Sequence, residues 1–269
     1  MNRLDEIVAC KKREVAEKKE LYPMKLLERS IYFNTPPLSL KTYIMRPDLN
    51  GIIAEFKRKS PSKGTLNEFA KPEQVCLHYM QAGASALSVL TDREFFGGTS
   101  DDLIAARIFN YCPILRKDFV IDEYQVVESK SIGADAILLI AEILTKKELV
   151  AFSAIASSLG LEVLHEVHSR KSIDKLPPQA SIVGVNNRNL NTFHVSINHA
   201  ASLISDLPGD VAKVVESGIT SPEMLLSMKG VGFNGFLIGE KFMREANPGK
   251  ACQAFINRLN TLTLNGIVA

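Results

Sequence analysis

The sequence predicts an α/β fold: a closed barrel of eight parallel strands and alternating helices, the (β/α)8 or TIM barrel, preceded by an N-terminal helical extension. From Gly51 onward, short apolar runs alternate with longer amphipathic ones. This alternation implies a parallel sheet, because parallel strands need a crossover helix between them. The 269 residues are about the size of one such barrel, so we expect a single domain over residues 1–269. An open, doubly wound sheet is the competing fold, but no GxGxxG motif follows the first strand.

Residues 1–50 form the expected extension. Apolar residues recur there at helical spacing, at Leu4, Ile7, Val8 and Val15, and a shorter helix is expected near Met24–Leu27. The charged run over residues 11–20 mixes both signs, so we interpret it as a solvated helix face rather than a nucleic-acid patch. Proline-containing segments at 35–37 and 46–48 break the chain before the barrel begins.

The barrel elements follow in order along the chain. The expected strands are Ile52–Lys57, Ala86–Leu90, Ile114–Lys117, Ala136–Ile140, Leu161–Val167, Ile182–Asn186, Val211–Glu216 and Phe236–Gly239. Helical patterns lie between them, for example at Pro72–Gln81, Glu123–Ser131, Lys146–Ser158 and Pro222–Met228. We count eight strands, the number that closes this barrel.

Composition excludes several classes of protein. The net charge is +2, so we expect neither nucleic acid nor a membrane as a partner. The four cysteines form no CxxC pair, and the N-terminus has no apolar signal core, so a reducing cytoplasm is the expected location. We expect a monomer, and association with other enzymes of the same pathway stays open.

Polar residues stand where the expected strands end. Inward positions alternate along a barrel strand, and chemistry gathers at the carboxyl ends of the strands. Five of the eight strands deliver a polar or charged residue there: Glu55, Lys57, Lys117, Glu166, Asn186 and Glu216. Buried ion pairs that only fix the strand register are the alternative interpretation. Convergence of five strands favours an active site, in which paired carboxylates and ammonium groups suit proton transfer.

A phosphate site is expected after strands seven and eight. Small residues there let backbone N–H groups approach an anion, as at Ser217, Gly218 and Gly239, followed by Glu240. The segment Ser60–Gly64 after the first strand suits a mobile loop over a phosphorylated substrate, although an ordinary solvated loop has the same composition.

The histidines do not predict a metal site. His165 and His168 are three residues apart on a strand, so they point to opposite faces, and the pattern is not HExxH. We interpret His78, His194 and His199 as unclustered structural or surface residues.

At these residues the chain resembles indole-3-glycerol phosphate synthase over almost its whole length. The resemblance rests on the helical extension and on segments 53–62, 88–92, 95–98, 115–119, 133–140, 166–168, 184–190 and 216–219, which include the motifs Ile53-Ala54-Glu55-Phe56-Lys57 and Leu115-Arg116-Lys117-Asp118-Phe119. It implies a phosphorylated small-molecule substrate, 1-(2-carboxyphenylamino)-1-deoxyribulose 5-phosphate. The implied products are indole-3-glycerol phosphate, carbon dioxide and water, in tryptophan biosynthesis. No metal or organic cofactor is implied.

The resemblance also implies roles for individual residues. Lys117 matches the general acid of ring closure, Glu166 the acid and base of the dehydration, and Glu55 a second catalytic carboxylate. Lys57 matches the lysine that meets the substrate carboxylate, with a proton-donor role as the alternative. Asn186 and Glu216 match residues that orient the substrate. The implied phosphate contacts are Ser60, Ser217, Gly218 and Gly239. The implied apolar wall is Phe96, Phe119, Leu138, Ile140 and Leu190, with Arg188 as a substrate-binding arginine.

Three positions depart from the family pattern. Glu240 stands where a serine often follows Gly239, and we expect its carboxylate to turn away and leave its N–H as the donor. Thr99 replaces a serine, and His165 replaces an aliphatic residue that faces the helices. A Schiff-base aldolase on the same fold and a non-catalytic sugar-phosphate sensor are the rival functions.

Overall fold

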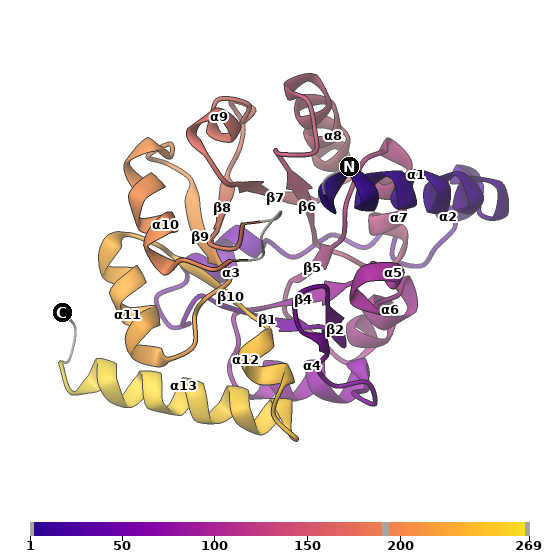
Figure 1. Cartoon of the computed structure of the whole chain (residues 1–269). Coiled ribbons are helices and arrows are strands. Elements are labelled where there is room, and N and C mark those ends of the chain that lie inside the picture. The colour runs from indigo at the N-terminus through magenta and orange to yellow at the C-terminus, as the bar shows by residue number, and fades with distance from the viewer. Residues whose placement is uncertain (1–2, 190–193, 267–269) are drawn as a thin grey trace.

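The computed structural model, which describes residues 3–189 and 194–266, confirms the closed barrel (Figure 1). The strands pair in the order β1-β10-β9-β8-β7-β6-β5-β4, and β4 closes onto β1. Every pairing in the barrel is parallel. The barrel strands are β1 Ile52–Phe56, β4 Ala86–Leu90, β5 Ile114–Lys117, β6 Ala136–Ile140, β7 Glu162–Val167, β8 Ile182–Asn186, β9 Ala212–Glu216 and β10 Gly235–Ile238.

Helices surround the barrel and begin at residues that can cap them. Thr99 and Thr145 each close a capping box, with Asp102 and Glu148 respectively, and this explains why two of the outer helices start where they do. The helices are α1 Arg3–Leu21, α2 Met24–Leu27, α3 Leu40–Met45, α4 Pro72–Gln81, α5 Arg93–Phe96, α6 Ser100–Ile108, α7 Glu123–Ser131, α8 Lys146–Ser158, α9 Arg170–Ile173, α10 Ile197–Leu203, the 3-10 turn η1 Ile204–Asp206, α11 Pro222–Val231, α12 Glu240–Met243 and α13 Pro248–Leu264.

Two apolar cores hold the fold together. The larger lies between the barrel and the helices and includes the outward strand residues Ile52, Ala54 and Phe56. The smaller fills the barrel itself with inward residues such as Ile53 and Leu164. Because both faces of each strand are buried, the strands read as continuous apolar runs. Side chains point alternately inward and outward along each strand, and this alternation continues from Ile53 to Glu55 and from Leu164 to Glu166. Glu55 and Glu166 therefore point into the barrel near the carboxyl ends of their strands.

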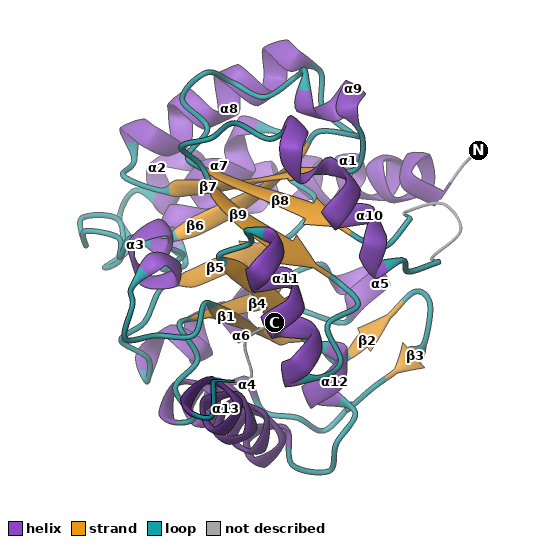
Figure 2. Ribbon diagram, turned by 90° about the vertical axis from the view of Figure 1, so that its left-hand side faces the viewer, coloured by secondary structure: helices purple, strands orange, loops and turns teal. Residues whose placement is uncertain are grey.

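The segment after β1 is more regular than the loop expected from its composition. Lys59–Ser60 (β2) pairs antiparallel with Gly64–Thr65 (β3). Figure 2 shows this hairpin beside the barrel, beyond the end at which the strands finish. The hairpin therefore forms one wall of that end of the barrel.

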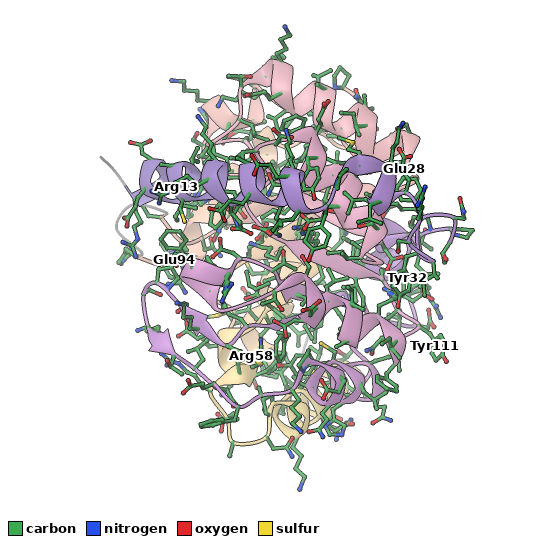
Figure 3. All side chains as sticks on the ribbon, turned by 90° about the vertical axis from the view of Figure 1, so that its right-hand side faces the viewer. Arg13, Glu28, Tyr32, Arg58, Glu94 and Tyr111 are labelled. Atoms are coloured by element: carbon green, nitrogen blue, oxygen red, sulfur yellow. The ribbon has the colours of Figure 1, made fainter. Side chains whose placement is uncertain are left out.

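The N-terminal extension lies against the barrel rather than apart from it. Figure 3 shows α1 crossing the side of the molecule, with Arg13 on the helix and Glu28 beyond its far end. Lys19 of α1 pairs with Asp122 at 2.8 Å, and Lys18 pairs with Glu128 of α7 at 2.9 Å. These contacts fix the helix over the outer layer at α7.

For Lys11, the expectation of a solvated helix face is wrong. Its side chain is buried, with 1% of the residue exposed, and Nζ lies 2.9 Å from Asp92 and 3.0 Å from Asp118. Glu14 of the same helix is a third partner, at 2.7 Å. Burial lowers the pKa of Lys11, but the three carboxylates outweigh it and raise that pKa well above its usual range. The ammonium is therefore a permanent buried cation joining α1 to the ends of two strands.

Replacing Lys11 with methionine is expected to lower the free energy of unfolding by about 3–5 kcal/mol, because buried carboxylates lose their partner. Lys12→Met is the matched control, since it removes the same charge from an exposed neighbour. Urea denaturation of both variants measures the difference. A loss under about 1 kcal/mol for Lys11→Met, the range of an exposed pair, would show that the cluster contributes no more than a surface contact.

Among the helices of the described part, none is both long enough and apolar enough to cross a membrane.

Candidate active site

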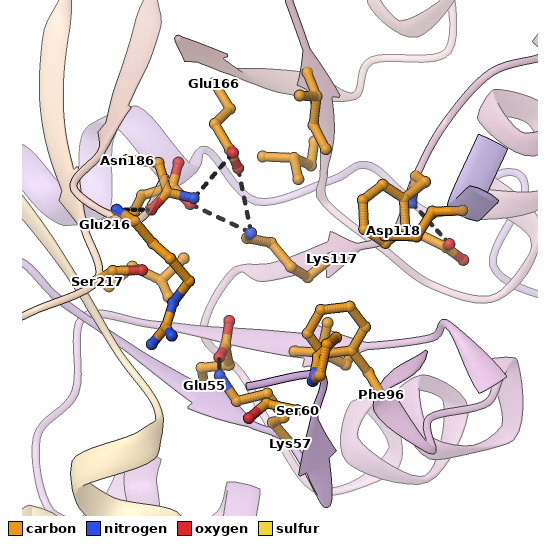
Figure 4. Close-up of a pocket in the computed structure, with 18 of the residues that line it drawn as sticks. Glu55, Lys57, Ser60, Phe96, Lys117, Asp118, Glu166, Asn186, Glu216 and Ser217 are labelled. Atoms are coloured by element: carbon orange, nitrogen blue, oxygen red, sulfur yellow. Dashed lines mark hydrogen bonds and ion pairs between the residues drawn. The ribbon is translucent and has the colours of Figure 1, made fainter. Parts of the chain in front are cut away.

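The polar strand ends meet in one cavity of about 110 Å³ at the carboxyl end of the barrel (Figure 4). The structure places all six predicted polar residues along it, one or two from each of five strands or the residues just after them: Glu55, Lys57, Lys117, Glu166, Asn186 and Glu216. Leu4 and Ile7 of α1 line the same cavity. The extension therefore completes the cavity wall as well as the outer layer.

Lys117 lies between two buried carboxylates. Its Nζ is 3.4 Å from Glu166 Oε2 and 3.3 Å from Glu216 Oε2. Burial lowers the pKa of Lys117, but Glu216, Glu166 and Glu55 together raise it well above the usual range. The ammonium therefore keeps its proton until a reacting group takes it.

Glu166 is the most heavily bonded carboxylate of the site. Besides Lys117, its Oε1 accepts hydrogen bonds from Asn186 Nδ2 at 3.0 Å and contacts His168 Nε2 at 3.0 Å. Burial raises its pKa, whereas Lys117, His168 and Asn186 outweigh that effect and hold the pKa below the ordinary value. Glu166 is therefore ionised before substrate binds.

Glu216 has the opposite character. Burial and the nearby charge of Glu166 raise its pKa to about 8, against the attraction of Lys117. Apart from the ion pair with Lys117, its carboxylate oxygens have no polar partner among the described residues. Two neighbouring carboxylates whose pKa values are pushed apart are a common arrangement for acid and base roles.

Gly184 of β8 makes room for Glu216, and sequence reasoning gave it no role in the site. A Cβ atom at Gly184 would lie 2.2 Å from Glu216 Oε1. A glycine inside a strand often marks such a close approach, and this signal could have identified the position.

Lys57 and Glu55 form a separate ion pair at the mouth of the cavity. Lys57 Nζ lies 2.6 Å from Glu55 Oε1. Lys57 lines both this cavity and the neighbouring one described below, so it stands between the two. A ligand that fills both cavities would pass directly over its ammonium group.

The apolar wall is assembled largely as predicted. Phe96 and Phe119 lie with ring centroids 6.1 Å apart, and Leu138 and Ile140 of β6 complete that side. Leu190 lies outside the described residues. A planar aromatic ring would find apolar contact on this side and charge on the other.

A second, larger cavity of about 690 Å³ adjoins the first at the loops after β9 and β10. The predicted phosphate residues Ser217, Gly218, Gly239 and Glu240 line it, as does Arg188. Ser217 and Gly218 have φ values of 66° and 88°, a left-handed turn that is unusual for serine. Such turns present successive N–H groups to an anion.

Glu240 lines this cavity, and its carboxylate pairs with two arginines. Its carboxylate lies 3.2 Å from Arg188 Nη2 and 3.0 Å from Arg244 Nη2. Arg188 also donates a hydrogen bond of 2.8 Å to Ser62 Oγ of the β2–β3 hairpin. These two ion pairs compensate the charge of the carboxylate, and its turning away from a bound phosphate stays a prediction.

Ser60 of the hairpin has an unpaired hydroxyl group at the first cavity. Its Oγ is buried and has no hydrogen-bond partner among the described residues. Buried hydroxyls are nearly always paired. Since Ser60 lines the first cavity, a polar group of a bound molecule would satisfy it.

Replacing Gly239 with alanine is expected to lower kcat/KM by about ten- to hundredfold, because it displaces a functional group by a fraction of an ångström. A Cβ atom there would lie 2.5 Å from Glu55 Oε1 and 2.9 Å from Glu55 Cβ, so the damage reaches Glu55 as well as any phosphate. Gly209→Ala is the control, since nothing lies within 4 Å of its added Cβ. Steady-state kinetics of both variants measure this loss. Equal kcat/KM values for the two variants would contradict the placement of Gly239 at the active site.

The structure confirms that His165 and His168 point to opposite faces of β7. His165 faces the helices, with Nε2 at 2.9 Å from Ser153 Oγ of α8, and His168 points the other way, toward Glu166. The described residues contain no group of three or more His, Cys, Asp or Glu side chains that could hold a metal ion. His194 and His199 line a third cavity together with His168.

Comparisons with known proteins agree with this arrangement. The family model described as indole-3-glycerol phosphate synthase matches residues 4–255. A protein of that name from Bacteroides thetaiotaomicron is 43% identical over 256 residues, covering 95% of this chain and 98% of the relative. One from Dechloromonas aromatica is 41% identical over 250 residues, covering 91% and 95%.

Similar solved structures bear on the fold alone. The alpha subunit of tryptophan synthase from Legionella pneumophila aligns with a TM-score of 0.58 at 15% identity, covering 80% of this chain and 93% of that one. Thiamine phosphate pyrophosphorylase from Pyrococcus furiosus aligns with a TM-score of 0.58 at 13% identity, covering 83% and 99%. Taken with the family model and the sequence relatives, the chain belongs to the indole-3-glycerol phosphate synthase family, whose members are decarboxylating lyases of tryptophan biosynthesis.

Proposed function

We propose that the first two cavities together bind 1-(2-carboxyphenylamino)-1-deoxyribulose 5-phosphate and convert it to indole-3-glycerol phosphate, carbon dioxide and water. The observation that carries the proposal is the placement of Lys117 between Glu166 and Glu216, opposite an apolar wall and beside an anion-binding turn. The aromatic ring would lie against Phe96 and Phe119. The phosphate would lie at the N–H groups that follow β9 and β10.

Ring closure needs an acid at the C2' carbonyl oxygen while the ring carbon bonds to C2'. Lys117 is the donor in this proposal, because it is the ammonium at the centre of the cavity and its neighbours keep it protonated. Loss of carbon dioxide then restores the aromatic ring. Asn186 and Glu216 would orient the substrate, and Lys57 would meet its carboxylate.

The dehydration that follows needs an acid and then a base. Glu166 would protonate the departing hydroxyl, and the same carboxylate would remove the C–H proton that completes the indole. Glu55, paired with Lys57 at 2.6 Å, would be the second carboxylate of this step. Incubating the purified chain with the substrate and following indole fluorescence tests the proposal, and no rise in fluorescence would refute it.

The rival aldolase mechanism makes a different covalent prediction. An aldolase lysine forms an imine with a keto-sugar phosphate, whereas ring closure here needs none. Borohydride added with such a ligand should therefore leave the mass of the chain unchanged. A reduced adduct on Lys57 or Lys117 would favour the aldolase.

Replacing Lys57 with alanine is expected to raise KM by about ten- to hundredfold while largely preserving kcat, because a charge-assisted contact of roughly 1.5–3 kcal/mol is lost. Lys63→Ala is a useful comparison, because Lys63 lines the second cavity, where the phosphate is expected, but does not line the first. Loss of turnover at saturating substrate would show instead that Lys57 is a proton donor.

A further inference from the structure

The proposed reaction has a proton requirement that its named residues do not meet. The carbonyl oxygen leaves as water and so takes up two protons, one in ring closure and one in the dehydration. Formation of the indole releases one C–H proton. Each turnover therefore consumes one proton, and this matches the loss of the substrate's carboxylate charge as neutral carbon dioxide.

That proton has to reach the inner end of the first cavity, where the carboxylates are shielded from solvent. Glu166 and Glu216 are each 1% exposed, and the substrate would fill the cavity mouth. Glu166 also begins as a carboxylate, since its partners hold its pKa low. It cannot act as an acid in the dehydration unless a neighbour first supplies a proton.

His168 is placed to supply it. Its Nε2 lies 3.0 Å from Glu166 Oε1, on the oxygen that Lys117 does not contact. Its backbone is fixed from both sides, because its N–H donates to Glu142 Oε1 at 3.1 Å and its carbonyl lies 2.9 Å from His199 Nε2. The imidazole is therefore held in position against the carboxylate.

The third cavity lies behind this histidine. It has a volume of about 480 Å³ and is lined by polar side chains that include Glu142, His168, Asn186 and His199. Asn186 and Leu4 line the first cavity as well, and His168 of the third cavity contacts Glu166 of the first, so the two cavities adjoin. Glu142 Oε2 is buried there with no hydrogen-bond partner among the described residues.

The charges around His168 favour its protonated form. Burial lowers the pKa of His168, but Glu166, Glu142 and Glu216 outweigh it and raise that pKa above the ordinary value. Of the other groups at this cavity, His194 and His199 also face it. An imidazolium there would be stabilised by the ionised Glu166, whose Oε1 lies 3.0 Å from Nε2.

We propose that His168 is a proton relay that carries one proton per turnover from the third cavity to Glu166. The inference rests on the proposed function, because it supplies the proton which that reaction consumes. In the transfer, the imidazolium gives its Nε2 proton to Glu166 Oε1 and becomes a neutral imidazole that keeps its proton on Nδ1. Glu166 is then the neutral acid that the dehydration needs, and one proton from water in the third cavity restores the imidazolium. The C–H proton that Glu166 removes afterwards passes to Lys117, 3.4 Å away, and replaces the one that Lys117 gave in ring closure.

Single-turnover formation of indole-3-glycerol phosphate tests the relay without interference from product release. In His168→Gln the amide still reaches toward Glu166 but cannot pass a proton, so we expect the rate to fall by about tenfold or more. His168→Ala should be slow as well, and added imidazole should raise its rate as the imidazole concentration increases. His78→Gln is the control, since it removes an exposed imidazole of α4 that lines none of the three cavities, and we expect a rate within about twofold of the unaltered chain.

A rate for His168→Gln within about twofold of the unaltered chain would overturn the relay and leave His168 only to position Glu166. Failure of imidazole to accelerate His168→Ala would overturn it as well. The unaltered chain run in parallel judges the proposed function separately, since that function fails only if this chain forms no product. A histidine NMR titration without substrate gives an answer independent of turnover: the pKa of His168 should lie above the ordinary histidine value and fall in Glu166→Gln, and an ordinary value in both would contradict the relay.

Discussion

Replacing Lys117 with alanine is expected to lower kcat by about two or more orders of magnitude, the usual cost of removing a general acid. The ammonium contacts both Glu166 and Glu216. Among the described residues that line this cavity, the other lysine is Lys57, which pairs with Glu55 instead. The variant should lose carbon dioxide release and indole formation together, because both follow ring closure. KM should change less than kcat.

Two comparisons make this test specific. Lys146→Ala removes the same charge from an exposed position on α8 and should be indistinguishable from the unaltered chain. Lys117→Met keeps much of the side-chain volume and should be as slow as the alanine variant, which separates loss of the proton from loss of packing. If Lys117→Ala retains most of its turnover while Lys57→Ala loses it, the two lysine roles are reversed.

Replacing Glu166 with glutamine is expected to lower the rate of indole formation by about 10²–10⁴-fold, the range for a lost acid and base. The amide keeps the shape of the carboxylate but cannot accept or return a proton. Because Lys117 is intact, ring closure and decarboxylation should still proceed once. A burst of one equivalent of carbon dioxide without indole fluorescence is therefore expected.

Glu162→Gln is a matched control on the same strand, since Glu162 lies at the opposite end of β7 and bonds Ser39 and Lys41 instead. It should leave both signals unchanged. Simultaneous loss of carbon dioxide release and indole formation in Glu166→Gln would place this carboxylate in the first step and contradict the division of roles.

The fold could be predicted because its signals are local. Each strand is an apolar run bounded by turn residues, and all eight expected strands match the structure to within one residue at each end. The bounds of α4, α7 and α8 agree with the expected ones, since Pro72, Asp122 and Thr145 mark their starts. The polar strand ends followed from the alternation along each strand.

What could not be predicted depends on partners distant in the sequence. The burial of Lys11 follows only from the approach of Asp92 and Asp118, which the helix pattern does not reveal. Arg116, beside Lys117, is likewise fully buried and pairs with Glu128 at 2.7 Å. Charged residues are expected to be exposed unless they are paired. Composition and periodicity therefore could not predict the burial of Lys11 or Arg116.

The same limit applied within the site. His168 and His199 belong to different βα units, and only the closed barrel brings them to one cavity. Glu240 departs from the pattern of its family, and its compensation by Arg188 and Arg244 needed the loop geometry. Such contacts are made by loops, whose conformations the apolar pattern leaves unspecified.

The most direct test of the central claim is a single-turnover measurement on the unaltered chain with enzyme in excess over 1-(2-carboxyphenylamino)-1-deoxyribulose 5-phosphate, in which carbon dioxide and indole-3-glycerol phosphate are quantified together. The account predicts one equivalent of each per substrate consumed, with carbon dioxide released no later than the indole appears. Recovery of unchanged substrate, or of a sugar-phosphate product without an indole, would contradict the assignment of this cavity to decarboxylating ring closure.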